Sequence, residues 1–313
     1  MPWYAVCSRQ PGNALIAAEC RRLTGGTPAA DGVASCNSIE RVASSAYLHY
    51  GVRPLAQAAS LPELAARVAR LALQAEGFRI ELLRLVARRS FEHFEAVTTL
   101  ADAIPADPDL SHPRIRFLLI ERSDGLYFTE ICAENNFDYR RYQSKPYHTS
   151  SSLSARLARA LVSLVAPGVR SILDPCCGTG SILLQARALG LTAFGSDRNP
   201  LMVEMTRGNL AHFGFSAEVT AQDASQVSQA ADAVVTDLPY GRFVHNDDAN
   251  LRSILDNCAR LAPQAVFAAG ADLSPWLAQA GYVEIEVLQV EKVRGFIRYI
   301  HHARSGVCNP PAP

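Results

Sequence analysis

Lysine is almost missing from this chain of 313 residues. Only Lys145 and Lys292 occur, so 28 of the 30 basic residues are arginine, and 30 acidic residues bring the formal net charge to zero. A balanced charge excludes a polycation that coats nucleic acid non-specifically, although it leaves room for a local basic face. Arginine suits phosphate contacts and base stacking, as in RNA binding. No arginine cluster is dense enough to favour that function over codon bias, which is the simpler explanation.

The sequence also lacks the patterns of a zinc, secreted or membrane protein. Among eight cysteines no Cys-x-x-Cys pair occurs, and the adjacent Cys176 and Cys177 are spaced unlike a zinc knuckle, so we predict no metal site. No secretory signal pattern opens the chain, and no apolar run reaches the about 18 residues that span a bilayer. We therefore expect reduced thiols and a cytoplasmic location, with no membrane partner. Hydrophobic residues make up 49%, which excludes a mainly disordered chain and, with the length, indicates about two domains.

The first 130 residues follow an α+β pattern. Ser60 and Glu63 are spaced as a capping box, and Leu64, Val68 and Leu71 approximate one apolar face of the helix that follows. The last two strands join through a turn that contains Asp-Gly, a hairpin signal. In order, the patterns predict a strand at 3–8, helices at 13–23, 39–49 and 60–74, a strand at 78–82, a helix at 91–104, and strands at 114–122 and 126–131.

From residue 153 strands and helices alternate, after a polar, aromatic and basic stretch at 133–150 that is typical of a linker. The alternation predicts a parallel, doubly wound α/β sheet, in which a ligand binds at the carboxyl ends of the strands. The tail at 282–303 is predicted to form an antiparallel hairpin. The expected elements are helices at 153–165, 181–189, 200–212, 248–261 and 274–280, and strands at 169–173, 192–196, 217–222, 231–236 and 265–269.

A glycine-rich turn follows the first of these strands. Asp174 closes the strand, and Gly178 and Gly180 let the backbone turn tightly before the next helix. A dinucleotide-binding fingerprint would place a third glycine at position 183, where this chain has Leu183. The pattern therefore disfavours a pyrophosphate and favours a smaller, nucleoside-like ligand.

Acidic residues end the next two strands. Asp197 is placed to accept from a ribose diol, and Asp223 from an adenine amino group. Each residue alone is more often a helix cap or a loop residue. Together with the glycine turn, and in strand order, they favour a cofactor that carries adenosine.

The fourth strand ends in Asp237-Leu238-Pro239-Tyr240. The Asp237 carboxylate and the Leu238 carbonyl are suited to accept both hydrogens of an exocyclic amine, while Tyr240 stacks on the ring that carries it. Such an amine is a poor nucleophile, and accepting its hydrogens aims its lone pair at an electrophile. A simple β-turn after a strand would explain the acid and the proline, but not the other two strand ends.

Three segments carry a family resemblance: 174–186 (DPCCGTGSILLQA), 195–200 (GSDRNP) and 236–241 (TDLPYG). They resemble class I S-adenosylmethionine-dependent methyltransferases that modify exocyclic amines. Residues 141–164 (RYQSKPYHTSSSLSARLARALVSL) are similar to the segment that leads into the catalytic domain of THUMP-domain RNA guanine-N2 methyltransferases. The tRNA guanine-10 members of that family are the nearest comparison. In the front half, ALIAAECRRLTGG resembles the small N-terminal domain and residues 55–131 a diverged THUMP domain.

This resemblance implies a class I, Rossmann-like methyltransferase domain at 153–313. Before it we expect a small ferredoxin-like α+β domain at 1–50, a THUMP-like RNA-binding domain at 51–132 and a linker at 133–152. It implies S-adenosyl-L-methionine as cofactor and Asp237, Leu238, Pro239 and Tyr240 as the residues that hold guanine. The implied cofactor-binding residues are Asp174, Cys176, Gly178, Thr179, Gly180, Asp197, Arg198, Asp223, Ala224, Asp237, His148, Thr149, Ser150 and Ser151. For residues 148–151 a helix N-cap is an equal alternative.

One position departs from the family pattern. The commonest family form is Asp-Pro-Pro-Tyr, whereas Leu238 stands at the second position here. The chemistry uses the backbone of that position, so we expect activity to survive.

The implied reaction is in-line transfer of the sulfonium methyl group to N2 of a flipped guanine in RNA. The preferred substrate is tRNA, and rRNA is an alternative. The front half would hold the folded RNA by shape and phosphate, and some relatives act with a small zinc-binding partner protein. The alternatives are adenine N6 or a protein glutamine amide as the amine, an RNA-binding subunit without catalysis, and a nicotinamide oxidoreductase. The tail offers further phosphate contacts, although a solvated edge hairpin is an equal explanation; these candidates are Lys292, Arg294, Arg298, His301, His302 and Arg304.

Overall fold

The computed structural model describes residues 2–9, 13–87, 90–165, 167–239, 248–293 and 296–307. They fold into two compact units. Unit 1 comprises residues 1–11, 24–43 and 47–136, and unit 2 comprises residues 12–23, 44–46 and 137–313. The division after residue 136 falls inside the stretch expected to be a linker, part of which forms a 3₁₀ helix at Asp138–Ser144.

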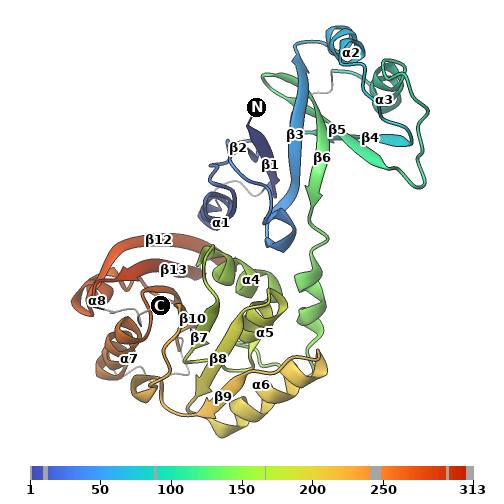
Figure 1. The fold of residues 1–313 in the computed structure, drawn as a ribbon. Helices are drawn as coiled ribbons and strands as arrows, with labels where there is room; N and C mark the ends of the chain where they lie inside the picture. The colour runs from blue at the N-terminus through green and yellow to red at the C-terminus, as the bar shows by residue number, and fades with distance from the viewer. Residues whose placement is uncertain are drawn as a thin grey trace. The chain divides into compact units, whose positions relative to one another are not determined.

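Within the described residues, unit 1 is built on a six-stranded sheet in the order β2-β1-β3-β6-β5-β4 (Figure 1). Helices α2 (Leu61–Arg70) and α3 (His93–Ala101) pack on it through a core that includes Leu64, Leu100 and Phe117. The strand β3 pairs with both β1 and β6 and crosses residue 50 without interruption. The domain division at 1–50 and 51–132 stays a prediction. The strands are β1 (Trp3–Cys7), β2 (Val33–Cys36), β3 (Leu48–Ala58), β4 (Phe78–Arg84), β5 (Ile115–Arg122) and β6 (Gly125–Glu134).

Two local predictions in this unit are wrong. Instead of a helix at 39–49, the chain forms one 3₁₀ turn at Val42–Ser44 and then enters β3. The apolar spacing there reflects tertiary packing: a Cβ on Gly51 of β3 would lie 2.5 Å from the Ile39 Cβ. At the start of α2, Ser60 makes no side-chain cap, although Glu63 reaches back to accept from the Ala59 amide at 3.3 Å.

The described part of unit 2 is built on a seven-stranded sheet in the order β12-β13-β11-β10-β7-β8-β9 (Figure 1). Strands β7 to β11 are parallel, and β12 and β13 form the predicted antiparallel hairpin. The strands are β7 (Ser171–Asp174), β8 (Thr192–Asp197), β9 (Glu218–Ala221), β10 (Ala233–Asp237), β11 (Gln264–Ala269), β12 (Tyr282–Val293) and β13 (Phe296–Ser305). The helices are α4 (Ala155–Leu164), α5 (Ser181–Ala188), α6 (Pro200–His212), α7 (Asp248–Leu261) and α8 (Ser274–Gln279).

The winding of this sheet confirms the predicted doubly wound topology. From the central β7 the chain builds outward to β8 and β9, then returns to the other side of β7 with β10. The direction of winding therefore reverses between β7 and β10, which is where open α/β sheets bind their ligands. No helix in the described part of the chain is long and apolar enough to cross a membrane.

Helix α1 (Ala14–Thr24), up to residue 23, belongs to unit 2 despite its early place in the sequence. The Glu19 carboxylate is fully buried and accepts from the Ser45 hydroxyl and the Ala46 amide, both at 2.7 Å. At the end of the helix, Arg22 hydrogen-bonds the His302 ring of β13 at 2.7 Å. The helix is thus part of the folded unit that contains the parallel sheet.

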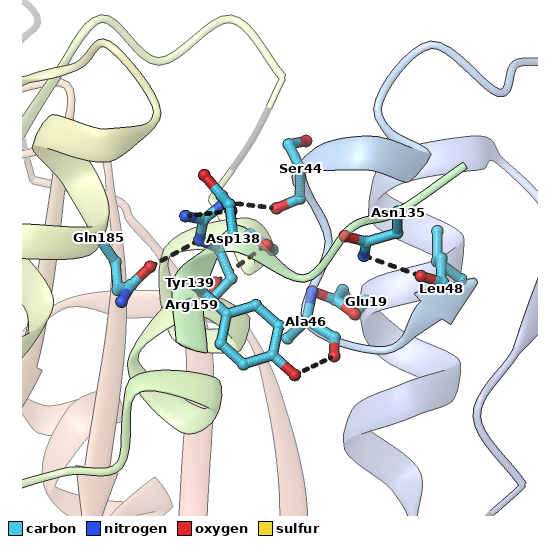
Figure 2. A network of polar contacts seen from close by, with 10 residues as sticks. Glu19, Ser44, Ala46, Leu48, Asn135, Asp138, Tyr139, Arg159 and Gln185 are labelled. Atoms are coloured by element: carbon cyan, nitrogen blue, oxygen red, sulfur yellow. Dashed lines mark hydrogen bonds and ion pairs between the residues drawn. The ribbon is translucent and has the colours of Figure 1, made fainter. Parts of the chain in front are cut away.

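A buried arginine, Arg159, joins residues 44–46 to helices α4 and α5 (Figure 2). Arg159 of α4 is 1% exposed, and its guanidinium donates to Gln185 Oε1 at 2.7 Å and to the Ser44 carbonyl at 3.0 Å. Asp138 accepts from the same group at 3.3 Å and supplies the counter-charge. Because a buried guanidinium is costly without partners, the network holds residues 44–46 against α4 and α5.

Candidate functional site

A cavity of about 460 Å³ lies where the winding of the unit 2 sheet reverses. Its volume is in the usual range for small-molecule sites. The lining comes from the ends of β7, β8 and β10, from the loop before α5 with its first turn, and from the segment before α4. The lining residues are Thr149, Ser150, Ser151, Ser152, Leu153, Asp174, Cys176, Cys177, Gly178, Thr179, Ser181, Ile182, Asp197, Met202, Asp237, Leu238 and Pro239.

Two glycines shape the loop between β7 and α5. Gly178 and Gly180 have φ of +52° and +79°, which side-chain-bearing residues rarely adopt. A Cβ on Gly180 would lie 2.8 Å from Thr206 Cγ2, so this glycine allows the close approach of α6. A Cβ on Gly178 would meet no atom within 4 Å. Gly178 therefore leaves open space at the cavity wall, which a ligand can use.

Leu183 stands where a dinucleotide fold has its third glycine, and the structure shows what replaces that glycine. Leu183 is fully buried, and a Cβ on Gly195 of β8 would lie 2.6 Å from Leu183 Cδ1. The glycine that lets α5 pack closely on the sheet is therefore on the strand instead of the helix.

Asp174 ends β7 and is 1% exposed. Its Oδ1 accepts from the Thr236 hydroxyl at 2.7 Å and from the Cys176 amide at 3.2 Å. Burial raises the pKa of Asp174 to about 7, with a smaller contribution from the negative charges of Asp237 and Asp197, while its hydrogen bonds act in the opposite direction. A cation in the cavity would favour the ionised carboxylate.

Asp197 ends β8 and shares its carboxylate between the loop and the cavity. Oδ2 accepts from the Gly178 amide and Oδ1 from the Asn199 amide, both at 2.9 Å. An ionised carboxylate has about four acceptor positions. Asp197 therefore fixes the glycine loop and retains acceptor capacity for a diol.

Asp223, Ala224 and Arg198 do not line the cavity. The Asp223 carboxylate caps the 3₁₀ turn at Ala224–Gln226 by accepting from the Ser225 amide at 2.9 Å and its hydroxyl at 2.6 Å. These hydrogen bonds lower the pKa of Asp223, and the charge of Arg198 adds to the effect. A role for these three residues toward adenine stays a prediction.

Hydroxyl groups of residues 149–152, which we call the serine wall, line another side of the cavity. Ser152 links the wall to the glycine loop, because its Oγ lies 2.9 Å from Thr179 Oγ1 and also accepts from the Thr149 amide at 2.9 Å. Ser152 was not among the residues predicted from the sequence. The predicted His148 is exposed and does not line the cavity.

Asn209 of α6 holds the chain just before the serine wall. Its Oδ1 accepts from the Tyr147 amide at 2.9 Å, and its Nδ2 donates to the carbonyls of Tyr147 and Thr179 at 2.8 Å. The side chain is fully buried. It therefore ties this segment to the glycine loop. Sequence reasoning missed it because an asparagine inside a helix carries no local signal of such contacts.

The end of β10 brings Asp237, Leu238 and Pro239 to the cavity. The Leu238 side chain is 2% exposed and belongs to the core cluster that includes Leu255. Its amide donates to the Ala268 carbonyl at 2.9 Å. Leucine at this position therefore anchors the loop through packing, while the backbone follows β11. Tyr240 lies outside the described residues.

Arg298 lies beside one of the cavity's aspartates, which the sequence pattern did not predict. It lies on β13, is 4% exposed, and its Nη2 lies 3.8 Å from Asp237 Oδ2. His301 and His302 are buried as well. Arg298, His301 and His302 were expected to contact RNA phosphates. That expectation is wrong, because their side chains are buried on a strand that lies between β11 and β12 in the sheet. Arg304 is exposed, and Arg294 lies outside the described residues.

The two cysteine thiols that line the cavity are in their neutral form. Burial raises the pKa of Cys176 and of Cys177 well above the ordinary value, and the charge of Asp174 adds to this. Since a thiolate is the reactive form of cysteine, nucleophilic catalysis by these thiols is disfavoured. The charged residues that line the cavity itself are its aspartates.

Comparison with known proteins places this unit. Residues 140–273 match the family model described as RMKL-like, methyltransferase domain. A tRNA (guanine(10)-N2)-dimethyltransferase from Methanothermobacter thermautotrophicus is 40% identical over 132 residues, 40% of this chain and 37% of that protein. One from Pyrococcus abyssi is 37% identical over 111 residues, 34% of this chain and 33% of that protein. The alignments thus span about a third of the length of these curated relatives.

Two solved structures resemble the fold over both units. TrmN from Thermus thermophilus has a TM-score of 0.51 and 20% identity, over 97% of this chain and 100% of that one. A possible methylase from Clostridium difficile 630 has a TM-score of 0.50 and 13% identity, with 100% of both chains covered. With the sheet order and the cavity, these findings define unit 2 as a class I methyltransferase fold. Within it, residues 140–273 are similar to the RMKL-like methyltransferase domain.

Proposed function

We propose that this protein is an S-adenosylmethionine-dependent methyltransferase that modifies the exocyclic N2 of guanine in tRNA. The observation that carries the proposal is the convergence of Asp174, Asp197 and Asp237, the ends of three neighbouring strands, on one cavity beside a glycine loop. The substrate class is supported by the curated relatives, which are tRNA (guanine(10)-N2)-dimethyltransferases and are 40% and 37% identical to this chain over 132 and 111 residues.

The residues present fit S-adenosylmethionine. Asp197 has acceptor capacity for the ribose diol, and Asp174 offers a carboxylate to the ammonium group of the methionine end. Ile182 and Met202 supply apolar contacts in the same cavity, and Gly178 leaves open space at its wall. When bound, the cofactor supplies a methyl group on an electrophilic sulfonium sulfur.

Asp237 prepares the nucleophile in this proposal. Its carboxylate and the Leu238 carbonyl accept the hydrogens of the guanine amine, which aims the nitrogen lone pair at the methyl carbon. Arg298 holds the Asp237 carboxylate in place and stabilises its negative charge. The bound cofactor would supply the methyl group with its thioether as leaving group, and Asp237 or water would accept the proton that the methylated amine loses. The stacking role of Tyr240 belongs to the same proposal.

Unit 1 is assigned to RNA binding. Its α+β sheet is suited to hold folded RNA by shape and phosphate contacts, and we retain the THUMP-like assignment for residues 51–132 as part of the proposal. Cytoplasmic tRNA is the corresponding substrate pool.

The test is to incubate the purified full chain with labelled S-adenosylmethionine and with unmodified tRNA and rRNA, and then to identify the labelled nucleoside. Label in N2-methylguanosine or N2,N2-dimethylguanosine from tRNA is the expected result. Label in rRNA guanine or in adenine N6 would contradict the substrate assignment while keeping the cofactor. Cofactor binding without label in any RNA, even with the small partner protein that some relatives use, would support a non-catalytic RNA-binding subunit.

A further inference from the structure

Lys145 is a buried cation that the mechanism above does not use. It is 7% exposed and follows the 3₁₀ helix Asp138–Ser144. Pro146 comes next, and a residue before proline is disfavoured in the helical region; Lys145 accordingly has φ −56° and ψ 140°. The helix ends at this point, and the lysine side chain is buried behind the cavity wall, where its Nζ donates to the Ser181 hydroxyl.

No carboxylate in the described part of the chain forms an ion pair with Lys145. Its pKa is lowered to about 8 by burial, with no opposing contribution from a negative charge. The contrast is Arg159, whose buried guanidinium has Asp138 as an anionic partner. Burying an ammonium group without an anion costs free energy. An anionic ligand near Lys145 would offset that cost.

Ser181 connects this cation to the cavity. It lines the cavity, is the first residue of α5, and donates to the Leu153 carbonyl at 3.1 Å while it accepts from Lys145. The one hydrogen of its hydroxyl therefore points to Leu153, so an anion at this place would accept from backbone amides at the start of α5 and be attracted by the Lys145 charge behind the hydroxyl. The amino end of α5 favours a negative charge at the same place, and the hydroxyls of the serine wall add further hydrogen-bond donors.

The charges around the cavity are thus divided. The strand ends contribute the aspartates, whereas the segment that leads to the serine wall contributes Lys145. A zwitterionic amino-acid group matches this division, with its ammonium toward Asp174 and its carboxylate toward Ser181. The cysteine, methionine and glycine residues in the rest of the lining carry no charge.

We propose that Lys145 is a positioning residue whose charge, at the amino end of α5 beside Ser181, attracts and orients the carboxylate at the amino-acid end of the cofactor. This inference rests on the proposed function, since it presupposes an adenosine cofactor with an amino-acid end. It adds a binding determinant from outside the strand ends and the glycine loop. It also assigns a specific function to one of the two lysines in the chain.

The test compares two ligands that differ in one group. S-adenosylhomocysteine carries the carboxylate, and its decarboxylated counterpart keeps the adenosine, the thioether and the ammonium. Affinities of both for the full-length protein are measured by calorimetry at pH 7. The wild type is expected to prefer S-adenosylhomocysteine. Lys145→Met should weaken its binding about tenfold, the scale of one charge-assisted hydrogen bond, and leave the decarboxylated ligand unchanged or bound more tightly.

Two further variants separate charge from packing. Lys145→Gln keeps a hydrogen-bond donor without the charge and is expected to lose carboxylate preference as Lys145→Met does. Arg140→Met removes an exposed cation from the neighbouring 3₁₀ helix and should change neither affinity. Denaturant unfolding of ligand-free Lys145→Met should show a stability equal to or above that of the wild type, because an apolar side chain replaces a buried charge.

An equal loss for both ligands, or unchanged binding of S-adenosylhomocysteine in Lys145→Met and Lys145→Gln, would overturn the role of Lys145. If Lys145→Met does not fold, Lys145→Gln decides by the same ligand pair. Failure of the wild type to bind either ligand would contradict the proposed function itself, which is a different result from loss of discrimination between them.

Discussion

The strand ends and the serine wall form two sides of the same cavity, but they are positioned in different ways. Asp174, Asp197 and Asp237 each end a strand of one parallel sheet, so the backbone pairing of the sheet brings them together. The serine wall has no such pairing and depends on buried side chains from other elements: Asn209 holds Tyr147 just before the wall, and Thr179 contacts Ser152. Chemical groups at strand ends are therefore placed by topology, while the opposing wall is placed by individual hydrogen bonds.

The largest effect is expected at the strand ends. Asp237→Ala removes the acceptor that orients the amine, so kcat should fall by at least about a hundredfold, whereas affinity for S-adenosylhomocysteine stays within about threefold. Steady-state kinetics and calorimetry measure the two quantities. Asp256→Ala, which changes an exposed acid on α7, is the control. Retained turnover in Asp237→Ala would remove this residue from the mechanism.

A change at the serine wall should instead reduce stability and binding together. Asn209→Ala leaves the Tyr147 and Thr179 backbone groups without this partner, and we expect a loss of about 2–3 kcal/mol in unfolding free energy. Cofactor affinity should fall in the same variant, because the wall loses its anchor. Asn199→Ala, which removes the cap of the same helix, should cost about 1 kcal/mol. Urea denaturation that ranks the two variants equally would contradict the anchoring role.

Arg298 tests whether a strand-end acid also needs a side-chain partner. Arg298→Met should lower kcat about tenfold with little change in cofactor affinity, because the guanidinium acts through Asp237 and does not line the cavity. Arg298→Lys should restore part of the loss, since it keeps the charge. A purely structural role would lower stability and change kcat and cofactor binding together. Arg304→Met, an exposed position on the same strand, is the matched control.

The smallest effect concerns pH. Burial raises the pKa of Asp174 from 3.8 to about 7, so between these pH values the folded chain holds a proton that the unfolded chain has released. This contribution to stability is full below about pH 4 and is lost as the pH rises to about 7. Asp174→Asn should remove it, which makes the difference in stability between variant and wild type grow with pH across this window. A difference that does not depend on pH would refute the raised pKa.

The part of the site that the sequence predicts and the part that it does not predict follow the same division between strand ends and the other elements. The glycine turn, the three strand-end acids and the doubly wound order could be predicted, because each depends on residues adjacent in sequence and on the rule that parallel strands end at one edge. Lys145, Asn209 and Arg298 could not, because their partners Ser181, Tyr147 and Asp237 lie far away in sequence. The helix predicted at 39–49 failed for the same reason: its apolar residues pack against β3, not along a helix.

The split of unit 2 along the chain has a consequence for how the protein folds during synthesis. Helix α1 is translated after β1 but before the rest of unit 1, whose sheet is complete once Glu134 has been made. Two of the contacts that fix α1 and residues 44–46 in unit 2, those with Arg159 and His302, need residues translated later. Since domains generally fold as units on the growing chain, unit 1 is free to fold first, and α1 waits for the last strand of the seven-stranded sheet.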